Sequence, residues 1–174
     1  MNFKYFVEEG RKKRKKLINE FFELPEDVIL EILELGKTRI IKEPSTGYIT
    51  RYWFNIGEER YNVRFMKNDD NFYEMGFVFD KEAKDFTGLT YKYQASRIYS
   101  GLLDAFKMFI EEHNPKEITM NITSPKSAEH FSKVIKIAFK KYNNIFGDYK
   151  VKGIKKKNID DFLILNILTI ERKR

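Results

Sequence analysis

The chain offers few side chains that could bind a metal ion or perform acid–base catalysis. It has no cysteine, which excludes thiol catalysis, disulfides and thiolate metal sites. Its two histidines, His113 and His130, have carboxylates as neighbours that could complete a metal site, namely Glu111, Glu112 and Glu129. Nothing in the spacing brings the histidines together, and both fall near the ends of expected helices. We therefore expect no metal site.

Two pairs of adjacent aspartates, Asp69-Asp70 and Asp160-Asp161, raise the possibility of general acid–base chemistry. Each pair falls in an expected turn, where aspartate is favoured because its side chain bonds to nearby backbone amides. A nuclease site would need acidic residues that converge from separate strands, together with a lysine. Acids and lysines in strands are so common by chance that their presence does not indicate a nuclease. We expect no catalytic residue and no cofactor.

One basic run is the strongest candidate for a binding site. It consists of Arg11, Lys12, Lys13, Arg14, Lys15 and Lys16 and carries six units of the net charge of +7. The rest of the chain is close to neutral. Consecutive cations attract polyanions with an affinity that falls steeply with salt. The alternative is a solvated segment of helix or tail.

An aromatic group early in the chain suggests a contact surface. Tyr48, Tyr52, Trp53 and Tyr61 lie in and around two expected strands. Aromatic side chains on an exposed sheet face could contact a partner or stack against bases. Aromatic residues in strands are also commonly part of the core.

The N-terminal part reads as helical. Residues 2–23 carry apolar positions on both sides of the basic run, and a second helix is expected between Pro25 and Gly36, because proline favours a first turn and glycine a helix end. We therefore divide the chain into an N-terminal helical arm, residues 1–36, and an α+β domain, residues 37–174.

The α+β domain shows strand and helix periodicities in a clear order. Alternating apolar residues predict strands at 52–56, 60–66 and 72–79. Two amphipathic helices follow, one ending near His113 and one beginning at Pro125, with further strands at 117–123, 149–154 and 162–170. Because residues 162–165 are apolar on both faces, the last strand is expected to be covered on both sides.

This order resembles the core of GNAT-type acyltransferases. The local match is strongest at residues 121–131, Asn-Ile-Thr-Ser-Pro-Lys-Ser-Ala-Glu-His-Phe, which are similar to the end of that family's fifth strand and the helix after it. Residues 86–88 and 95–118 are also similar to small phage-encoded proteins of GNAT-like fold. The resemblance implies a mixed, mainly antiparallel sheet packed by two amphipathic helices.

Two departures from the family pattern bear on function. Acyltransferases of this type hold the cofactor pyrophosphate with a glycine-rich turn at a helix N-terminus. Residues 89–95 contain bulky Tyr91 and Tyr93 in that place, and the family's aromatic hydroxyl falls at Phe131, which has none. The cofactor site is therefore expected to be degenerate.

From these observations we predict a non-enzymatic accessory binding protein with a protein or nucleic-acid partner. The alternatives are an acyl-CoA-dependent N-acyltransferase of GNAT type and an assembly component that docks through its N-terminal helices. The sequence leaves open whether the protein forms homo-oligomers. No run of 18 apolar residues occurs, so no membrane span is expected, and we expect a cytoplasmic protein, in a bacterial host if phage-encoded.

Overall fold

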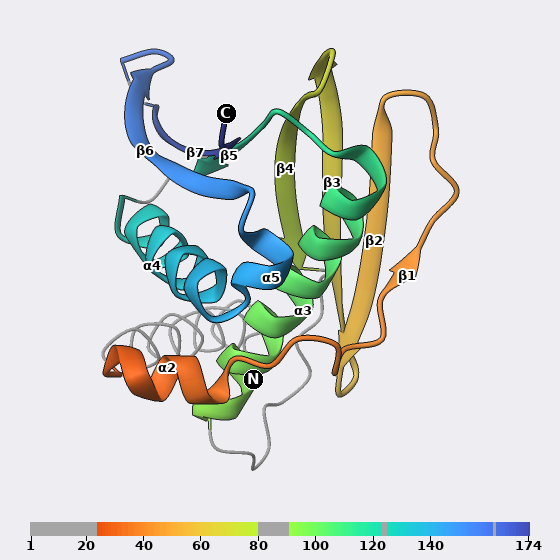
Figure 1. Cartoon of the computed structure of the whole chain (residues 1–174). Helices are drawn as coiled ribbons and strands as arrows, with labels where there is room; N and C mark the ends of the chain where they lie inside the picture. The colour runs from red at the N-terminus through yellow and green to blue at the C-terminus, as the bar shows by residue number, and fades with distance from the viewer. Residues whose placement is uncertain (1–23, 80–90, 123–124, 162) are drawn as a thin grey trace, which may run out of the picture.

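The computed structural model describes residues 24–79, 91–122, 125–161 and 163–174. These residues form one seven-stranded sheet with packed helices (Figure 1). The strands are β1 (Ile41–Lys42), β2 (Ile49–Ile56), β3 (Glu59–Asp69), β4 (Phe72–Phe79), β5 (Glu117–Ile122), β6 (Tyr149–Asn158) and β7 (Ile164–Arg172). The helices are α2 (Glu26–Ile32), α3 (Tyr91–His113), α4 (Pro125–Lys141) and α5 (Asn143–Phe146).

The strand order across the sheet is β1-β2-β3-β4-β5-β7-β6. Only β4 and β5 pair in parallel, and the other neighbours are antiparallel. A parallel pair needs a crossover connection, and α3 lies within it. The predicted α+β class, with a mixed, mainly antiparallel sheet in GNAT-like order, is confirmed.

The β2–β4 meander buries one face against α3. Tyr52, Phe54 and Phe65 are fully buried on this face, and the Phe65 ring stacks on Phe109 of α3 with centroids 3.8 Å apart. Gly101 permits the close approach of helix and sheet, because a Cβ there would lie 2.4 Å from the Phe54 ring. In Figure 1, α3 runs in front of these strands.

The second half of the sheet continues the same core. Phe106 of α3 stacks on Phe139 of α4, with ring centroids 6.1 Å apart, and contacts Phe146 of α5. Ile118 of β5 pairs in register with Tyr73 of β4 on one side and with a buried isoleucine of β7 on the other. One hydrophobic core therefore extends from β2 across the sheet to β7 and the start of β6.

The predicted coverage of the last strand on both sides is wrong at its beginning. Leu163 is 37% exposed and Ile164 51%. The reason is topological: β5 pairs with β7 only between Asn166 and Glu171. The β6–β7 hairpin therefore extends beyond the rest of the sheet, and its end has apolar residues without a covering layer.

Helix α2 is attached to α3 and α4 by buried contacts. Ile29 and Leu33 are fully buried in the main core. The Asp104 carboxylate accepts hydrogen bonds from the backbone N–H groups of Gly36, at 2.7 Å, and Thr38, at 3.3 Å. The domain boundary at residue 36 stays a prediction. Helix α2 precedes this boundary in the sequence, but it packs onto α3 and α4, which follow it. None of the described helices is long and apolar enough to cross a membrane.

Candidate functional site

The parallel pair at the centre of the sheet opens after three residue pairs. Phe72, Tyr73 and Glu74 of β4 pair with Glu117, Ile118 and Thr119 of β5. Beyond these residues β4 continues to Phe79 along β3, and β5 continues to Ile122 along β7. The two strands therefore separate toward their carboxyl ends, which is where ligands bind in many α/β sheets.

This separation leaves two strand edges that face each other inside the sheet. Residues 75–79 of β4 and 120–122 of β5 form no ladder with one another. An unpaired strand edge presents backbone N–H and C=O groups to any extended molecule that lies along it. The opening thus offers hydrogen bonds to a chain of amide groups.

An apolar hollow lies under this opening. Its volume is about 20 Å³, roughly the space of one water molecule. The side chains around it come from β4, β5, β7, α3 and α4, and all are uncharged. They are Met75, Tyr99, Leu102, Leu103, Phe106, Met120, Phe131, Val134, Ile135 and Ile170.

Tyr99 is the one residue with a hydroxyl among those that line the hollow. It is buried on α3, and its ring packs edge-on against Phe131 of α4, with centroids 5.5 Å apart. Burial raises the pKa of the Tyr99 phenol, so the group stays protonated through the neutral range. The family's aromatic hydroxyl is expected at position 131, where this chain has phenylalanine, and Tyr99 lies next to that position in space. The apolar stripe of α3, with Leu102 and Phe106 at helical spacing from Tyr99, was the signal that could have found it.

The histidines and aspartate pairs do not form a site. Within the described residues, no group of three or more His, Asp or Glu side chains could hold a metal ion. His113 lies against the Phe109 ring, with centroids 4.6 Å apart, and desolvation lowers its pKa. Desolvation also lowers the pKa of His130. In the turn at Asp160, the carboxylate accepts a hydrogen bond from Leu163 N–H at 2.8 Å, as expected of a turn residue.

The predicted aromatic surface is divided between two sides of the sheet. Tyr52 and Tyr61 are buried in the core, with 0% and 1% of their surface exposed. Trp53 is half-buried on the opposite face, and Tyr48 is exposed in the turn before β2. Tyr52 and Tyr61 are therefore unavailable to a partner. The basic residues Arg11, Lys12, Lys13, Arg14, Lys15 and Lys16 lie outside the described residues, so their role stays a prediction.

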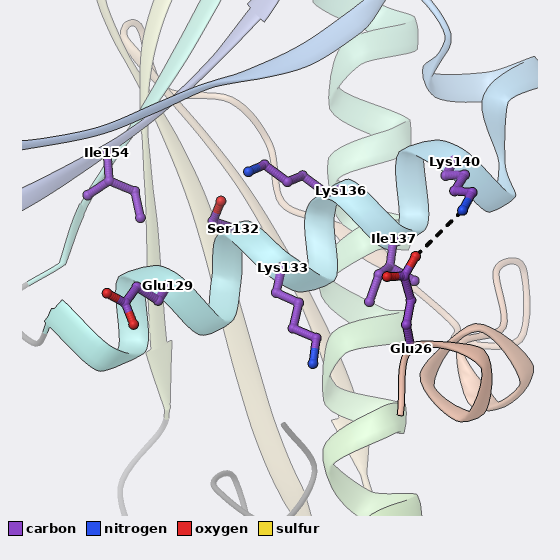
Figure 2. A pocket seen from close by; sticks show the side chains of 8 residues that line it. All are labelled: Glu26, Glu129, Ser132, Lys133, Lys136, Ile137, Lys140 and Ile154. Carbon is purple, nitrogen blue, oxygen red and sulfur yellow. Dashed lines mark ion pairs between the residues drawn. The ribbon is translucent and has the colours of Figure 1, made fainter. Parts of the chain in front are cut away.

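A second hollow follows the outer side of α4, with a volume of about 490 Å³. Lys133, Lys136 and Lys140 line it, together with Glu26 of α2 and Ile154 of β6. Glu26 is paired with Lys140 at 3.7 Å, and Figure 2 shows the Lys133 and Lys136 side chains extending in different directions. These cations do not converge on one point, so we do not assign a ligand to this hollow.

Comparisons with known proteins yield likenesses of fold. No protein-family profile matches the sequence, and no curated protein matches it significantly. Solved structures that match include the spermidine/spermine N-acetyltransferase SpeG from Vibrio cholerae (TM-score 0.44, 8% identity, 71% of this chain and 66% of that one). Another is RimL, a ribosomal L7/L12 alpha-N-protein acetyltransferase (TM-score 0.42, 13% identity, 71% of this chain and 60% of that one). A third is a chimera of Vibrio cholerae SpeG and hSSAT (TM-score 0.44, 8% identity, 84% of this chain and 90% of that one).

These comparisons correct the predicted function. All three proteins are N-acetyltransferases, which contradicts the predicted non-enzymatic accessory protein and leaves its acyltransferase alternative as a proposal. The similarity to phage-encoded proteins and the nucleic-acid partner find no support among them. At 8% to 13% identity the likenesses concern the fold alone, and the chain spans about two thirds or less of the first two proteins. Activity and substrates must be argued from this chain's own geometry.

Proposed function

We propose that the protein is an acyl-CoA-dependent N-acyltransferase of GNAT type. The observation that carries the proposal is the separation of β4 and β5 after three paired residues. It creates two facing strand edges over an apolar hollow in the middle of the sheet. An opening of this kind in the centre of a sheet gives an extended ligand access to free backbone groups.

The residues at this opening suit the pantetheine arm of acyl-CoA. That arm is an extended chain with two amide groups, which the free backbone edges of residues 75–79 and 120–122 could pair with by strand addition. The methylene groups and the sulfur end suit the apolar lining of Met75 and Met120. When bound, acyl-CoA would supply an acyl group activated as a thioester.

The hollow must widen to admit such an arm. At about 20 Å³ it holds far less than a pantetheine chain. Two of its walls are methionines, whose unbranched side chains change rotamer readily and fill irregular spaces. We assign the adjustment to Met75 and Met120, one from each of the two separating strands.

Tyr99 is our candidate for the proton donor of the reaction. Its buried phenol retains its proton at Oη at neutral pH, as the raised pKa requires, and it lines the hollow where the thioester end is expected. In this proposal it takes the place of the hydroxyl that Phe131 lacks. Of residues 89–95, where the family's pyrophosphate turn is expected, residues 89 and 90 lie outside the described residues.

The direct test is binding of acetyl-CoA, measured by thermal unfolding. A ligand at 100 times its dissociation constant stabilises the native state by about 2.7 kcal/mol, which for a chain of this size raises Tm by roughly 5–10 °C. We expect such a rise with acetyl-CoA and none with free adenosine. No rise at millimolar acetyl-CoA would contradict the proposal.

A matched pair of substitutions locates the site. Met120→Phe fills the hollow between the strands, whereas Met108→Phe makes the same change on α3 at a position 37% exposed. We expect the acetyl-CoA shift to be lost in the first variant and kept in the second. The Tm of each variant without ligand shows whether overpacking has itself reduced stability.

A further inference from the structure

The uncovered face of β2 and β3 places two arginines directly opposite each other. Arg51 and Arg64 are partners in the antiparallel register, and both are exposed. Directly opposed residues on one face have Cβ atoms about 5 Å apart, and like charges at this spacing are destabilising. Neither arginine forms an ion pair with another described residue. Within the part of the chain that the structure describes, the pair is therefore a concentration of positive charge without an ion-pair partner.

Gly76 of β4 makes room for one of these side chains. It is the register partner of Arg64, and a Cβ at this position would lie 2.8 Å from the Arg64 Nε atom. The Arg64 side chain thus lies across the neighbouring strand in a defined direction. The Arg64 side chain therefore loses little conformational entropy when an anion binds.

A third arginine on the same face is held by the only tryptophan of the chain. The Arg60 guanidinium lies 4.1 Å from the centre of the Trp53 ring, a distance typical of a cation–π contact. Arg60 and Arg64 are four residues apart on β3 and point to the same side, which separates their Cα atoms by about 13 Å. The face thus presents two oriented guanidinium groups, those of Arg60 and Arg64, together with the exposed Arg51.

From this arrangement we infer a docking surface for an extended acidic segment of a partner protein, formed by Arg51, Trp53, Arg60 and Arg64. Guanidinium groups bind carboxylates through two parallel hydrogen bonds. Carboxylates at positions i and i+4 of an extended peptide have the same spacing as Arg60 and Arg64. An acidic residue between Arg51 and Arg64 would relieve their repulsion.

The contact between Arg60 and Trp53 favours a peptide over single-stranded nucleic acid. Sequence-tolerant binding of single strands uses aromatic faces on which bases stack. Trp53 is half-buried, and Arg60 already lies over its ring at 4.1 Å. A base would have to displace this contact to stack there, whereas the exposed guanidinium groups are open to carboxylates. The surface faces away from the apolar hollow, so the inference is independent of the proposed acyl transfer.

Intrinsic fluorescence tests the inference, because Trp53 is the only tryptophan. The full chain is titrated with a synthetic peptide of alternating glutamate and threonine. The same peptide with glutamine in place of glutamate, and an oligothymidylate of equal charge, serve as comparison probes. We expect a saturable change in Trp53 emission with the glutamate peptide and none with the glutamine peptide.

A pair of double variants separates this surface from the general charge of the protein. Arg51→Gln with Arg64→Gln should weaken peptide binding about tenfold or more, since hydrogen bonds between charged groups are strong. Lys156→Gln with Lys157→Gln removes the same charge from the exposed end of β6 and should bind within about twofold of the unsubstituted chain. The basic run at residues 11–16 is present in every variant, so its contribution cancels.

Three results would overturn the inference: no saturable change in emission with the glutamate peptide, equal weakening in the two double variants, or tighter binding of oligothymidylate than of the peptide. All four substituted residues are exposed, and equal Tm values will confirm that the variants fold.

Discussion

At the scale of single residues, Asp104 is the most informative side chain outside the site. It is a buried carboxylate on α3 that accepts hydrogen bonds from the backbone of Gly36 and Thr38. Desolvation raises its pKa above the ordinary value of 3.8, and the two backbone hydrogen bonds act in the opposite direction. Asp104 thus fixes the segment after α2 by hydrogen bonds, although burial makes its charged form unfavourable.

The raised pKa predicts how stability depends on pH. The folded state binds the Asp104 proton more tightly than the unfolded state, so this residue contributes most below pH 3.8, and its contribution falls as pH rises through the folded-state pKa. Asp104→Asn keeps one acceptor oxygen, replaces the other with an amide NH2 group, and does not titrate. We expect the unfolding free energy of the native chain, minus that of the variant, to decrease with rising pH in urea titrations. A difference that is constant with pH would contradict this account.

Asp104→Ala is the matched control. It leaves the N–H groups of Gly36 and Thr38 without their acceptor, at a cost of about 1–3 kcal/mol. That cost adds a roughly constant amount to the same pH-dependent difference, because alanine, like asparagine, does not titrate.

Tyr99 permits a test of the proposed chemistry. If it donates the proton, Tyr99→Phe should lower kcat about 100-fold or more, with the dissociation constant of acetyl-CoA little changed, because only the hydroxyl is removed. The constant is measured by thermal unfolding and kcat by release of free thiol. Equal loss of binding and turnover would assign Tyr99 a packing role instead.

At the scale of elements, the contact between α3 and α4 determines much of the stability. Phe106 and Phe139 are buried, and their rings stack across the two helices. Phe106→Ala and Phe139→Ala should each cost about 3–5 kcal/mol in chemical denaturation. Because the rings contact each other, the double variant should lose less than the sum of the single losses.

The control for this pair is Met108→Ala, on α3 at a position 37% exposed. It should cost less than about 1 kcal/mol. Small losses at both phenylalanines would mean that the helices do not cover the sheet as described.

Periodicity was sufficient to predict most elements but not the faces they use. Alternation in the meander indicated one apolar face, and β3 and β4 follow it. Tyr52 and Trp53, however, were both assigned to one contact surface, although adjacent strand residues point to opposite sides. The end of β7 was predicted to be buried from its apolar residues alone, whereas its exposure depends on where β5 stops.

The candidate site was not predictable from local sequence for a related reason. It depends on where two strands separated by the whole of α3 stop pairing, and this length is set by long-range packing. Tyr99 approaches position 131 only through the contact between α3 and α4. The sequence comparison could examine position 131 but not its neighbours in space.

At the scale of the whole molecule, charge is concentrated in one short run. Replacing Arg11, Lys12, Lys13, Arg14, Lys15 and Lys16 with glutamine would lower the net charge from +7 to +1. We predict that the variant leaves a heparin column at clearly lower salt than the native chain, because each cation that contacts a polyanion adds to the salt dependence. Replacing six lysines spread over the surface is the control for net charge alone. Equal shifts in the two variants would mean that the run has no special role.

The attachment of α2 has a consequence for the order in which the chain becomes structured during synthesis. The backbone of Leu35 bonds to the Tyr142 hydroxyl, 107 positions later, and Ile29 and Leu33 are buried only once the helices of the second half are in place. A ribosome adding about 5–20 residues per second needs roughly 5 to 20 seconds to make that interval. α3 is made within this interval, but α4, the other helix that covers α2, is complete only at Lys141. Until then the apolar side of α2 lacks part of its native cover, and a nascent-chain chaperone would find a binding site there.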